Sequence, residues 1–391
     1  MRAQQLMFKV AAMTILAGAA AGAGLALGDL SDARRAVTVI ASGPLPVTGP
    51  PAVTGPSAVT GPPVATEPPA ATGPPAAREP PVPRPAPVPV SSFRAPLYYQ
   101  PFGSDVDIVG RALDASGARE LILACVLDAG GCRPAGQGDP ARRVGADAAV
   151  AATIDSVRRR GGDVSVSFGG AAGTELGAGC ATERALADAY QKVVETHDLT
   201  RIDLDYEADD LTAGIGKRMR AVRLLLDRAG AAHRPLRISL TLPVTRAGLP
   251  PAGLGALRAA LDAGIRPDVV NLMAFNLGPG TATADIQGAV EAAHRQVKGL
   301  LGGTDAQVYA RLGLQMMIGR ADVRGEELSP AGARSLVDYA RRRHLGWVSF
   351  WSLNRDRACP TPAPAQPAVP TCSGVAQRPY EFASIVAGYA G

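Results

Sequence analysis

The chain has 391 residues, 47% of them apolar, and its 40 lysines and arginines against 35 aspartates and glutamates give a net charge of +5. This balance raises the question of a nucleic-acid partner, but the triple-arginine runs at 158–160 and 341–343 fit the last turns of helices, where cations complement the helix dipole and a glycine follows. Neither run is interleaved with aromatic residues, so we expect no nucleic-acid binding.

Residues 1–30 have the pattern of an export segment. Arg2 and Lys9 accompany an apolar stretch from residue 6 to residue 27, and no acidic residue occurs before Asp29. Small residues at 19–23 offer sites of the kind that signal peptidase cleaves. About 20 apolar residues can also span a bilayer. A cleaved secretory signal and a membrane anchor both stay open, so we expect a protein that is either secreted or tethered to the outer face of the membrane.

Residues 31–92 form a proline-rich stretch with a six-residue repeat. A Thr-x-Pro triplet recurs in one register at 48–50, 54–56, 60–62, 66–68 and 72–74. Such a sequence buries little and favours extended polyproline conformations that glycines interrupt. We expect a spacer that holds the following domain away from the signal or anchor.

Residues 93–391 are enough for one large domain with a substantial core. Apolar runs predict strands, and segments of helical periodicity lie between them, for example at 146–160, 183–196, 217–229, 282–301 and 330–343. The eight predicted strands are 97–101, 121–127, 163–168, 201–207, 236–242, 269–275, 312–318 and 347–351.

This repeated strand–helix alternation predicts an α/β fold, a (β/α)8 TIM barrel. A doubly wound open sheet is the competing architecture. Its glycine-rich nucleotide fingerprint is missing after the first strand, so we favour the barrel.

Three acids alternate at the end of the fourth predicted strand. Asp203, Asp205 and Glu207 share one face of it, because successive side chains of a strand point to opposite sides. Carboxylates crowded in a cleft raise one another's pKa, so one of them can stay protonated near neutral pH. The carboxyl ends of the strands carry the chemistry of such barrels, which makes the outermost acid, Glu207, the candidate general acid. The alternatives are a solvated Glu207 and an Asp203 that is a hydrogen-bonded core group.

The five cysteines suit two disulfides and one free thiol in an exported protein. Cys359 and Cys372 flank a loop rich in proline and alanine, Cys132 with Cys180 completes the set, and Cys125 lies within a predicted strand as a buried thiol. No Cys-x-x-Cys spacing occurs and the four histidines are scattered singly. We therefore expect neither a metal nor another cofactor.

Three motifs in strand order resemble those of glycoside hydrolase family 18, the chitinase family, over nearly everything after residue 93. Residues 165–170 end in Gly-Gly like the family's third strand, residues 200–207 are similar to its Asp-x-x-Asp-x-Asp-x-Glu signature, and residues 270–276 resemble its sixth strand. The segments 317–319 and 351–356 look like a bacterial, actinobacterial-type branch of the family.

The resemblance implies substrate-assisted, retaining hydrolysis of β-1,4-linked N-acetylglucosamine in a polysaccharide or oligosaccharide. Glu207 would protonate the glycosidic oxygen, while Asp205 would hold the acetamido group whose carbonyl attacks the anomeric carbon, with Asp203 as support. We expect the protein to act as a monomer. The resemblance also implies substrate contacts from Asn276, Trp351, Met273, Phe275, Gly169 and Gly170.

Two departures from the family pattern support a second hypothesis, a carbohydrate-binding relative with weak or no turnover. Phe275 stands where a tyrosine hydroxyl usually contacts the acetamido oxygen, and aromatic residues that could stack on sugars are sparse, with Trp347 and Trp351 the only tryptophans. Thr200 replaces the first Asp of the signature, but members of this branch can lack that Asp, so we discount this loss. Asn276 can donate a hydrogen bond to the acetamido oxygen, but it can equally cap a loop. The complete row of three acids favours the enzyme.

Overall fold

The computed structural model of the protein describes residues 93–101, 107–360 and 368–390. The predicted signal or anchor (1–30) and the predicted spacer (31–92) lie outside these residues. In the described part of the chain, no helix combines the length and the hydropathy that a membrane span requires.

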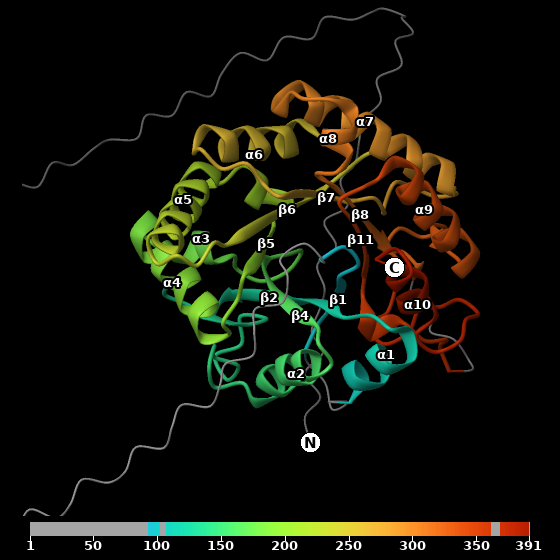
Figure 1. The fold of residues 1–391 in the computed structure, drawn as a ribbon, viewed down its shortest axis with the longest axis horizontal. Coiled ribbons are helices and arrows are strands. Elements are labelled where there is room, and N and C mark those ends of the chain that lie inside the picture. Colours follow the sequence, from blue (N-terminus) through green and yellow to red (C-terminus); the bar gives the residue numbers. More distant parts are fainter. Residues whose placement is uncertain (1–92, 102–106, 361–367, 391) are drawn as a thin grey trace, which may run out of the picture. The chain divides into compact units, whose positions relative to one another are not determined.

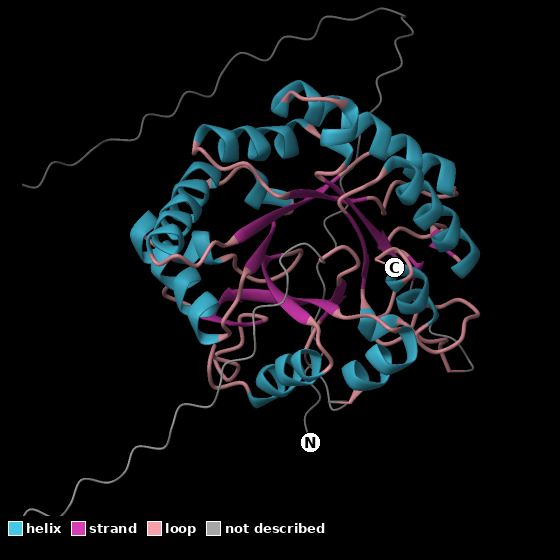
Figure 2. Cartoon of the chain, in the orientation of Figure 1, coloured by secondary structure: helices cyan, strands magenta, loops and turns pink. Residues whose placement is uncertain are grey.

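Eight parallel strands close into a barrel, and helices surround it (Figures 1 and 2). The first strand pairs with both the second and the last, which closes the ring. The strands follow one another around the barrel in chain order: β1 (Leu97–Tyr99), β2 (Glu120–Asp128), β4 (Asp163–Gly169), β5 (Arg201–Asp205), β6 (Arg237–Pro243), β7 (Val269–Met273), β8 (Leu312–Met317) and β11 (Trp347–Trp351). The predicted TIM barrel is confirmed.

The helices surround the barrel (Figure 2), and all of them except α10, which follows the last strand, lie between successive strands of the chain. They are α1 (Ile108–Ser116), α2 (Ala148–Arg159), α3 (Leu176–Gly179), α4 (Glu183–Thr196), α5 (Ile215–Ala231), α6 (Pro251–Asp262), α7 (Thr283–Leu301), α8 (Asp305–Tyr309), α9 (Pro330–Arg343) and α10 (Glu381–Ala387). Short elements complete the fold: β3 (Pro134–Gly136), antiparallel to β2, the hairpin β9 (Gly319–Arg320) and β10 (Glu327–Leu328), and the 3-10 turns η1 (Ala208–Leu211) and η2 (Leu353–Arg355).

The strands have two faces that pack differently, as alternation requires. Their outward side chains join the helices in the main apolar core, where for example the rings of Phe168 and Tyr190 meet edge to face at 4.7 Å. Inward side chains form a smaller apolar cluster that includes Tyr98 and Trp347. The inside of the barrel is therefore filled by side chains, several of them polar.

Both expected disulfides are present, Cys132–Cys180 and Cys359–Cys372, and Cys125 is a buried free thiol. The first disulfide ties the segment before β3 to the end of α3. The second closes a segment whose central residues, 361–367, lie outside the described ones.

Replacing Cys132 and Cys180 by serine is expected to lower the free energy of unfolding more than replacing Cys359 and Cys372. The disulfides close segments of 48 and 13 residues, and the entropy that a crosslink removes from the unfolded chain grows with the segment, giving losses of about 4 and about 3 kcal/mol. Urea denaturation of both double variants measures the difference, with Cys125→Ala as the control for loss of a thiol alone. The reverse order would contradict the expectation.

Candidate active site

Asp203 lies at the centre of the barrel with no exposed surface. Four hydroxyl groups donate to its carboxylate: Tyr98 at 3.0 Å and Ser167 at 2.8 Å reach Oδ2, while Ser239 at 2.5 Å and Thr241 at 2.8 Å reach Oδ1. Burial raises the pKa of Asp203, and these hydrogen bonds oppose the rise. Asp203 is thus a hydrogen-bonded interior group, as one of the sequence alternatives held, and it lies beneath the other two acids.

A polar network extends from Asp203 across the barrel. The Asn271 amide nitrogen, on β7, donates to the Tyr98 hydroxyl at 3.0 Å and to the Gln315 side chain of β8 at 3.1 Å. Trp347 donates its indole N–H to the Asn271 oxygen at 2.7 Å. Burial raises the pKa of Tyr98 well above its usual range, so its hydroxyl keeps its proton. Side chains from β1, β7, β8 and β11 are thereby connected to the acid on β5.

Asp205 is the last residue of β5, and the residue is 4% exposed. Its Oδ1 has no hydrogen-bond partner in the described part of the chain. Burial, then the charges of Glu207 and Asp203, raise its pKa well above the ordinary value. A buried polar atom without a partner is uncommon in folded proteins, so Asp205 is a carboxyl group whose hydrogen bonding the described part of the protein does not complete.

Gly169 and Gly170 lie directly against Asp205. The Gly170 N–H donates to the Asp205 backbone oxygen at 2.8 Å. A side chain on Gly169 would meet that same oxygen, and both glycines have φ near +100°, a conformation that other residues rarely adopt. The Gly-Gly motif therefore lets β4 approach the strand that carries the acids.

Glu207 follows the end of β5 by two residues, although the sequence predicted a strand as far as 207. Its backbone remains extended (φ −127°, ψ 162°), so its side chain keeps the alternation. Burial, then the charges of Asp322 and Asp210, raise the pKa of Glu207 to about 7. A carboxyl group with this pKa can hold a proton at neutral pH and release it.

A buried ion pair holds the loop that follows Glu207. Arg218 of α5 and Glu175, both with side chains at most 1% exposed, form an ion pair behind this loop. Arg218 also donates to the Asp210 carboxylate at 2.7 Å and to the backbone oxygens of Asp210 and Ala213. The guanidinium thereby fixes the backbone immediately after the candidate acid.

Trp351 and Met273 each end a strand at the carboxyl end of the barrel, whereas Phe275 lies beyond the end of β7. The half-buried Trp351 ring is centred 6.3 Å from the ring of Tyr98, which hydrogen-bonds Asp203. Met273 is buried at the end of β7. Phe275 lines a cavity of about 130 Å³ that α7 and the segment 321–329 also border. The structure thus brings Trp351, but not Phe275, toward the centre of the network.

Asn276 is exposed, has a left-handed backbone (φ +59°) and holds a loop. Its side-chain oxygen accepts the backbone N–H groups of Asp322 and Val323 at 3.2 and 3.3 Å, and its amide nitrogen donates to the Asp322 carboxylate at 3.0 Å. Its own N–H donates to Glu326 at 2.7 Å. The loop-capping alternative describes these contacts, and they bring Asp322 near the acids.

Sequence reasoning missed the partners of the acids. Tyr98, Ser167, Ser239 and Thr241 hold Asp203, and the charge of Asp322 acts on Glu207. The signal that could have identified the hydroxyls is a polar residue at an inward position of an otherwise apolar strand. No comparable signal exists for Asp322, which approaches through loop contacts.

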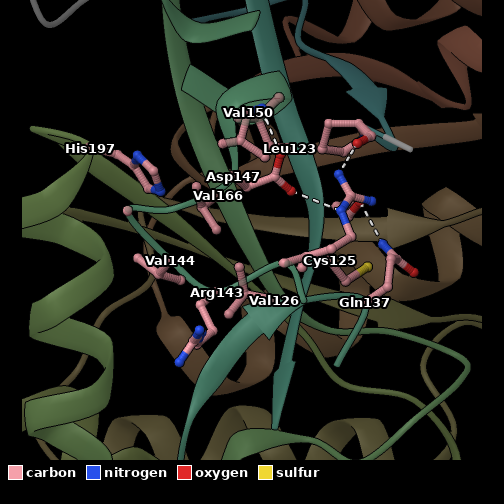
Figure 3. Close-up of a pocket in the computed structure, with 15 residues that line it drawn as sticks. Leu123, Cys125, Val126, Gln137, Arg143, Val144, Asp147, Val150, Val166 and His197 are labelled. Atoms are coloured by element: carbon pink, nitrogen blue, oxygen red, sulfur yellow. Dashed lines mark hydrogen bonds and ion pairs between the residues drawn. The ribbon is translucent and has the colours of Figure 1, made fainter. Parts of the chain in front are cut away.

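Figure 3 shows residues that line a small cavity, among them Leu123, Cys125 and Val126 of strand β2. Its volume of about 30 Å³ has room for about one water molecule and not for a sugar. Asp147 at its edge caps α2 and accepts a hydrogen bond from Arg142 at 2.8 Å. This cavity is a packing gap. Within the described ranges, no group of three or more His, Cys, Asp or Glu side chains could hold a metal ion.

Comparison with known proteins adds relatives of two kinds. No protein-family model matches the chain. Two curated proteins are each 33% identical to it over 217 residues, or 52% of this chain: endochitinase 11 of Metarhizium anisopliae and a probable bifunctional chitinase/lysozyme of Escherichia coli K12. The match covers 42% and 24% of these proteins, so the chain spans less than half the length of either.

Solved structures agree over more of the chain. Catalytic-site mutants of active domain 2 of a chitinase from Pyrococcus furiosus align with a TM-score of 0.68 at 26% identity, over 78% of this chain and 96% of that one. Mutants of the same domain complexed with chito-oligosaccharides align with a TM-score of 0.67 over 78% and 95%. A family GH18 chitinase from Chromobacterium violaceum shares the fold at a TM-score of 0.51 and 14% identity, over 78% and 84%. By these similarities the chain resembles chitinases in sequence and shares their barrel fold.

Proposed function

We propose that the protein hydrolyses β-1,4-linked N-acetylglucosamine, with Glu207 as the general acid. The observation that carries this proposal is one juxtaposition: a carboxyl group with a pKa of about 7 lies next to Asp205, whose buried Oδ1 has no partner among the described residues. The relatives described above include chitinases, one of them studied with chito-oligosaccharides, which supports the substrate class. The segments 317–319 and 351–356 support a place in the actinobacterial-type branch.

The proposed reaction needs no nucleophile from the protein. Protonated Glu207 donates its proton to the glycosidic oxygen while that bond breaks, and the substrate's own acetamido oxygen attacks the anomeric carbon. The free Oδ1 of Asp205 accepts the acetamido N–H, which orients the group and increases the electron density on its oxygen. Ionised Glu207 then takes a proton from the water that opens the cyclic intermediate. Two displacements at one carbon give retention of configuration.

Asp203 supports this chemistry without touching the substrate. Its charge is one of the causes that raise the pKa of Asp205. Its four hydroxyl partners fix the strand on which Asp205 stands. We therefore assign Asp203 a positioning role, and Trp351 and Met273 the role of substrate contacts near the acids.

A second candidate function, carbohydrate binding without turnover, also has support. Phe275 has no hydroxyl and lies toward α7, and the side chain of Asn276 is engaged by the loop at 322–323. Neither residue is placed to stabilise the acetamido oxygen in the transition state. The row of acids nevertheless favours the enzyme.

Export completes the proposal. Two disulfides are typical of proteins that fold in an oxidising compartment. We propose the boundaries 1–30 for a signal or anchor, 31–92 for a spacer and 93–391 for the catalytic barrel.

Glu207→Gln is expected to lower kcat on chito-oligosaccharides by about 10²–10⁴-fold, because an amide cannot donate the proton. Wild type should cleave acetylated oligomers and leave fully deacetylated ones intact, since the acetamido oxygen is the nucleophile. Release of a chromophore from labelled oligomers measures the kcat of the variant and the selectivity of wild type for acetylated sugars. Calorimetric binding of the same sugars is the control. Sugar binding by a wild type that releases no product would support the binding-protein alternative instead.

The pH dependence should follow Glu207. The reaction needs its protonated form, so kcat/KM should fall as the pH rises above about 7. Asp322 raises this pKa through its negative charge, so Asp322→Asn should lower the pKa and move the basic limb of the profile to lower pH. Asp338→Asn, on the exposed side of α9, is the matched control. A basic limb that moves equally in both variants would refute the role of Asp322.

Arg218→Met should lower the free energy of unfolding by about 3–5 kcal/mol, because it leaves Glu175 buried without its cation. Adding Glu175→Gln removes the stranded charge and should restore part of the loss. Urea denaturation of the two variants tests this. A double variant that is less stable than Arg218→Met alone would show that Glu175 is not a destabilising unpaired charge in the single variant, and would contradict this expectation.

A further inference from the structure

A large cavity lies at the amino ends of the barrel strands, at the opposite end of β5 from Asp205. Its volume is about 820 Å³, which falls within the range of small-molecule sites. The first residues of β5, β6, β7 and β11 line it, together with the loops that precede these strands. The chemistry proposed above makes no use of this end of the molecule.

Arginine dominates the charge of this cavity. Five arginines line it, and Asp268 is the carboxylate among the lining residues that the structure describes. Asp268 forms an ion pair with Arg237 at 3.1 Å. The lining is therefore strongly cationic even after its internal ion pair is taken into account. The five arginines are Arg94, Arg201, Arg237, Arg266 and Arg311.

Three of these arginines have no ion pair with any residue of the described ranges. Arg266 donates to the backbone oxygen of Leu301 at 3.4 Å, and Arg311 donates to that of Pro267 at 3.1 Å. Arg94 donates to a tyrosine hydroxyl at 3.3 Å. All three are exposed, and a guanidinium has five N–H donors, so each retains donors for a ligand.

Arg201 adds a charge that the protein compensates only in part. Its side chain is 12% exposed, its closest acid is Asp163 at 3.9 Å, and its Nε has no hydrogen-bond partner among the described residues. The Phe93 ring lies 4.0 Å from its guanidinium carbon. Burial lowers the pKa of Arg201, which means that its positive charge is costly where it stands. An anion in the cavity would offset that cost.

We propose that this cavity binds an anion that carries several phosphate groups, such as a short oligophosphate chain. The three exposed arginines come from three separate loops, before β1, before β7 and before β8, so the cavity is bordered by guanidinium groups from several directions of the chain. Guanidinium groups match phosphate oxygens in pairs, and a tetrahedral phosphate accepts donors from several directions at once. A concave surface of one charge also concentrates its field on such a ligand.

Calorimetric titration of the full chain with sodium tripolyphosphate tests the proposal. We expect binding at low salt that weakens as salt is added, because screening acts on exposed charges. Arg266→Ala with Arg311→Ala should weaken binding by roughly tenfold or more, as each removes charge-assisted hydrogen bonds. The matched control is Arg184→Ala with Arg342→Ala, which removes the same charge from exposed positions on α4 and α9 and should leave binding unchanged.

Further titrations distinguish a phosphate chain from other anionic ligands. Orthophosphate and citrate should bind more weakly than tripolyphosphate, and Arg266→Lys with Arg311→Lys should retain intermediate affinity, which distinguishes lost contacts from lost folding. Glu207→Gln should bind tripolyphosphate like wild type, so this result does not depend on the hydrolase proposal. No binding by wild type at low salt, or equal losses in the two alanine pairs, would overturn the proposal. Tighter binding of an oligonucleotide of equal charge would overturn it in favour of a nucleic-acid site.

Discussion

The buried carboxylate of Asp203 is the constraint on which the inside of this barrel depends. A carboxylate without exposed surface is stable only when hydrogen bonds from the protein replace those it made to water. Here hydroxyl groups from β1, β4 and β6 supply these hydrogen bonds. Ser167 and Ser239 are the residues paired in register with Asp203 on the two neighbouring strands. A shift of one residue in either strand would turn its hydroxyl outward, so the acid and the register of the sheet specify each other.

The same constraint separates the three acids. Along β5, Asp203 is fully enclosed and saturated with donors, Asp205 is nearly enclosed but has a free oxygen, and Glu207 lies beyond the strand within reach of the charges on two loops. Position along one strand thus gives three similar side chains three different surroundings, which support the separate roles proposed for them: support, acceptor and proton donor. The differences come from their surroundings and not from residue type, which is how paired carboxylates acquire different roles.

What the sequence could reveal divides along physical lines. Apolar runs placed the eight strands to within a few residues, alternation put the acids on one face, and helical periodicity gave α4 and α9 their observed bounds. Helical periodicity did not identify α6, which begins at Pro251 and has glycines at 253 and 255 that weaken a helical pattern. Nor did it give the four hydroxyl partners of Asp203, because these come from strands far apart in the chain. The approach of Asp322 depends on the loop that Asn276 holds, and no periodicity encodes it.

The two ends of the barrel carry side chains of opposite charge, although the net charge of the chain is small. Acids gather where the strands end, and arginines gather where the strands begin, three of them without an ion pair among the residues that the structure describes. The net charge of +5 sums over both ends of the barrel and does not reveal how the charges are distributed between them. The triple-arginine runs, which we assigned to the ends of helices, did not identify a basic surface either. In this fold the amino ends of all the parallel strands meet at one end of the barrel, and their carboxyl ends meet at the other. Residues that precede strands are therefore collected as effectively as residues that follow them, and a site built at the amino ends would be dispersed in the sequence in the same way as an active site at the carboxyl ends.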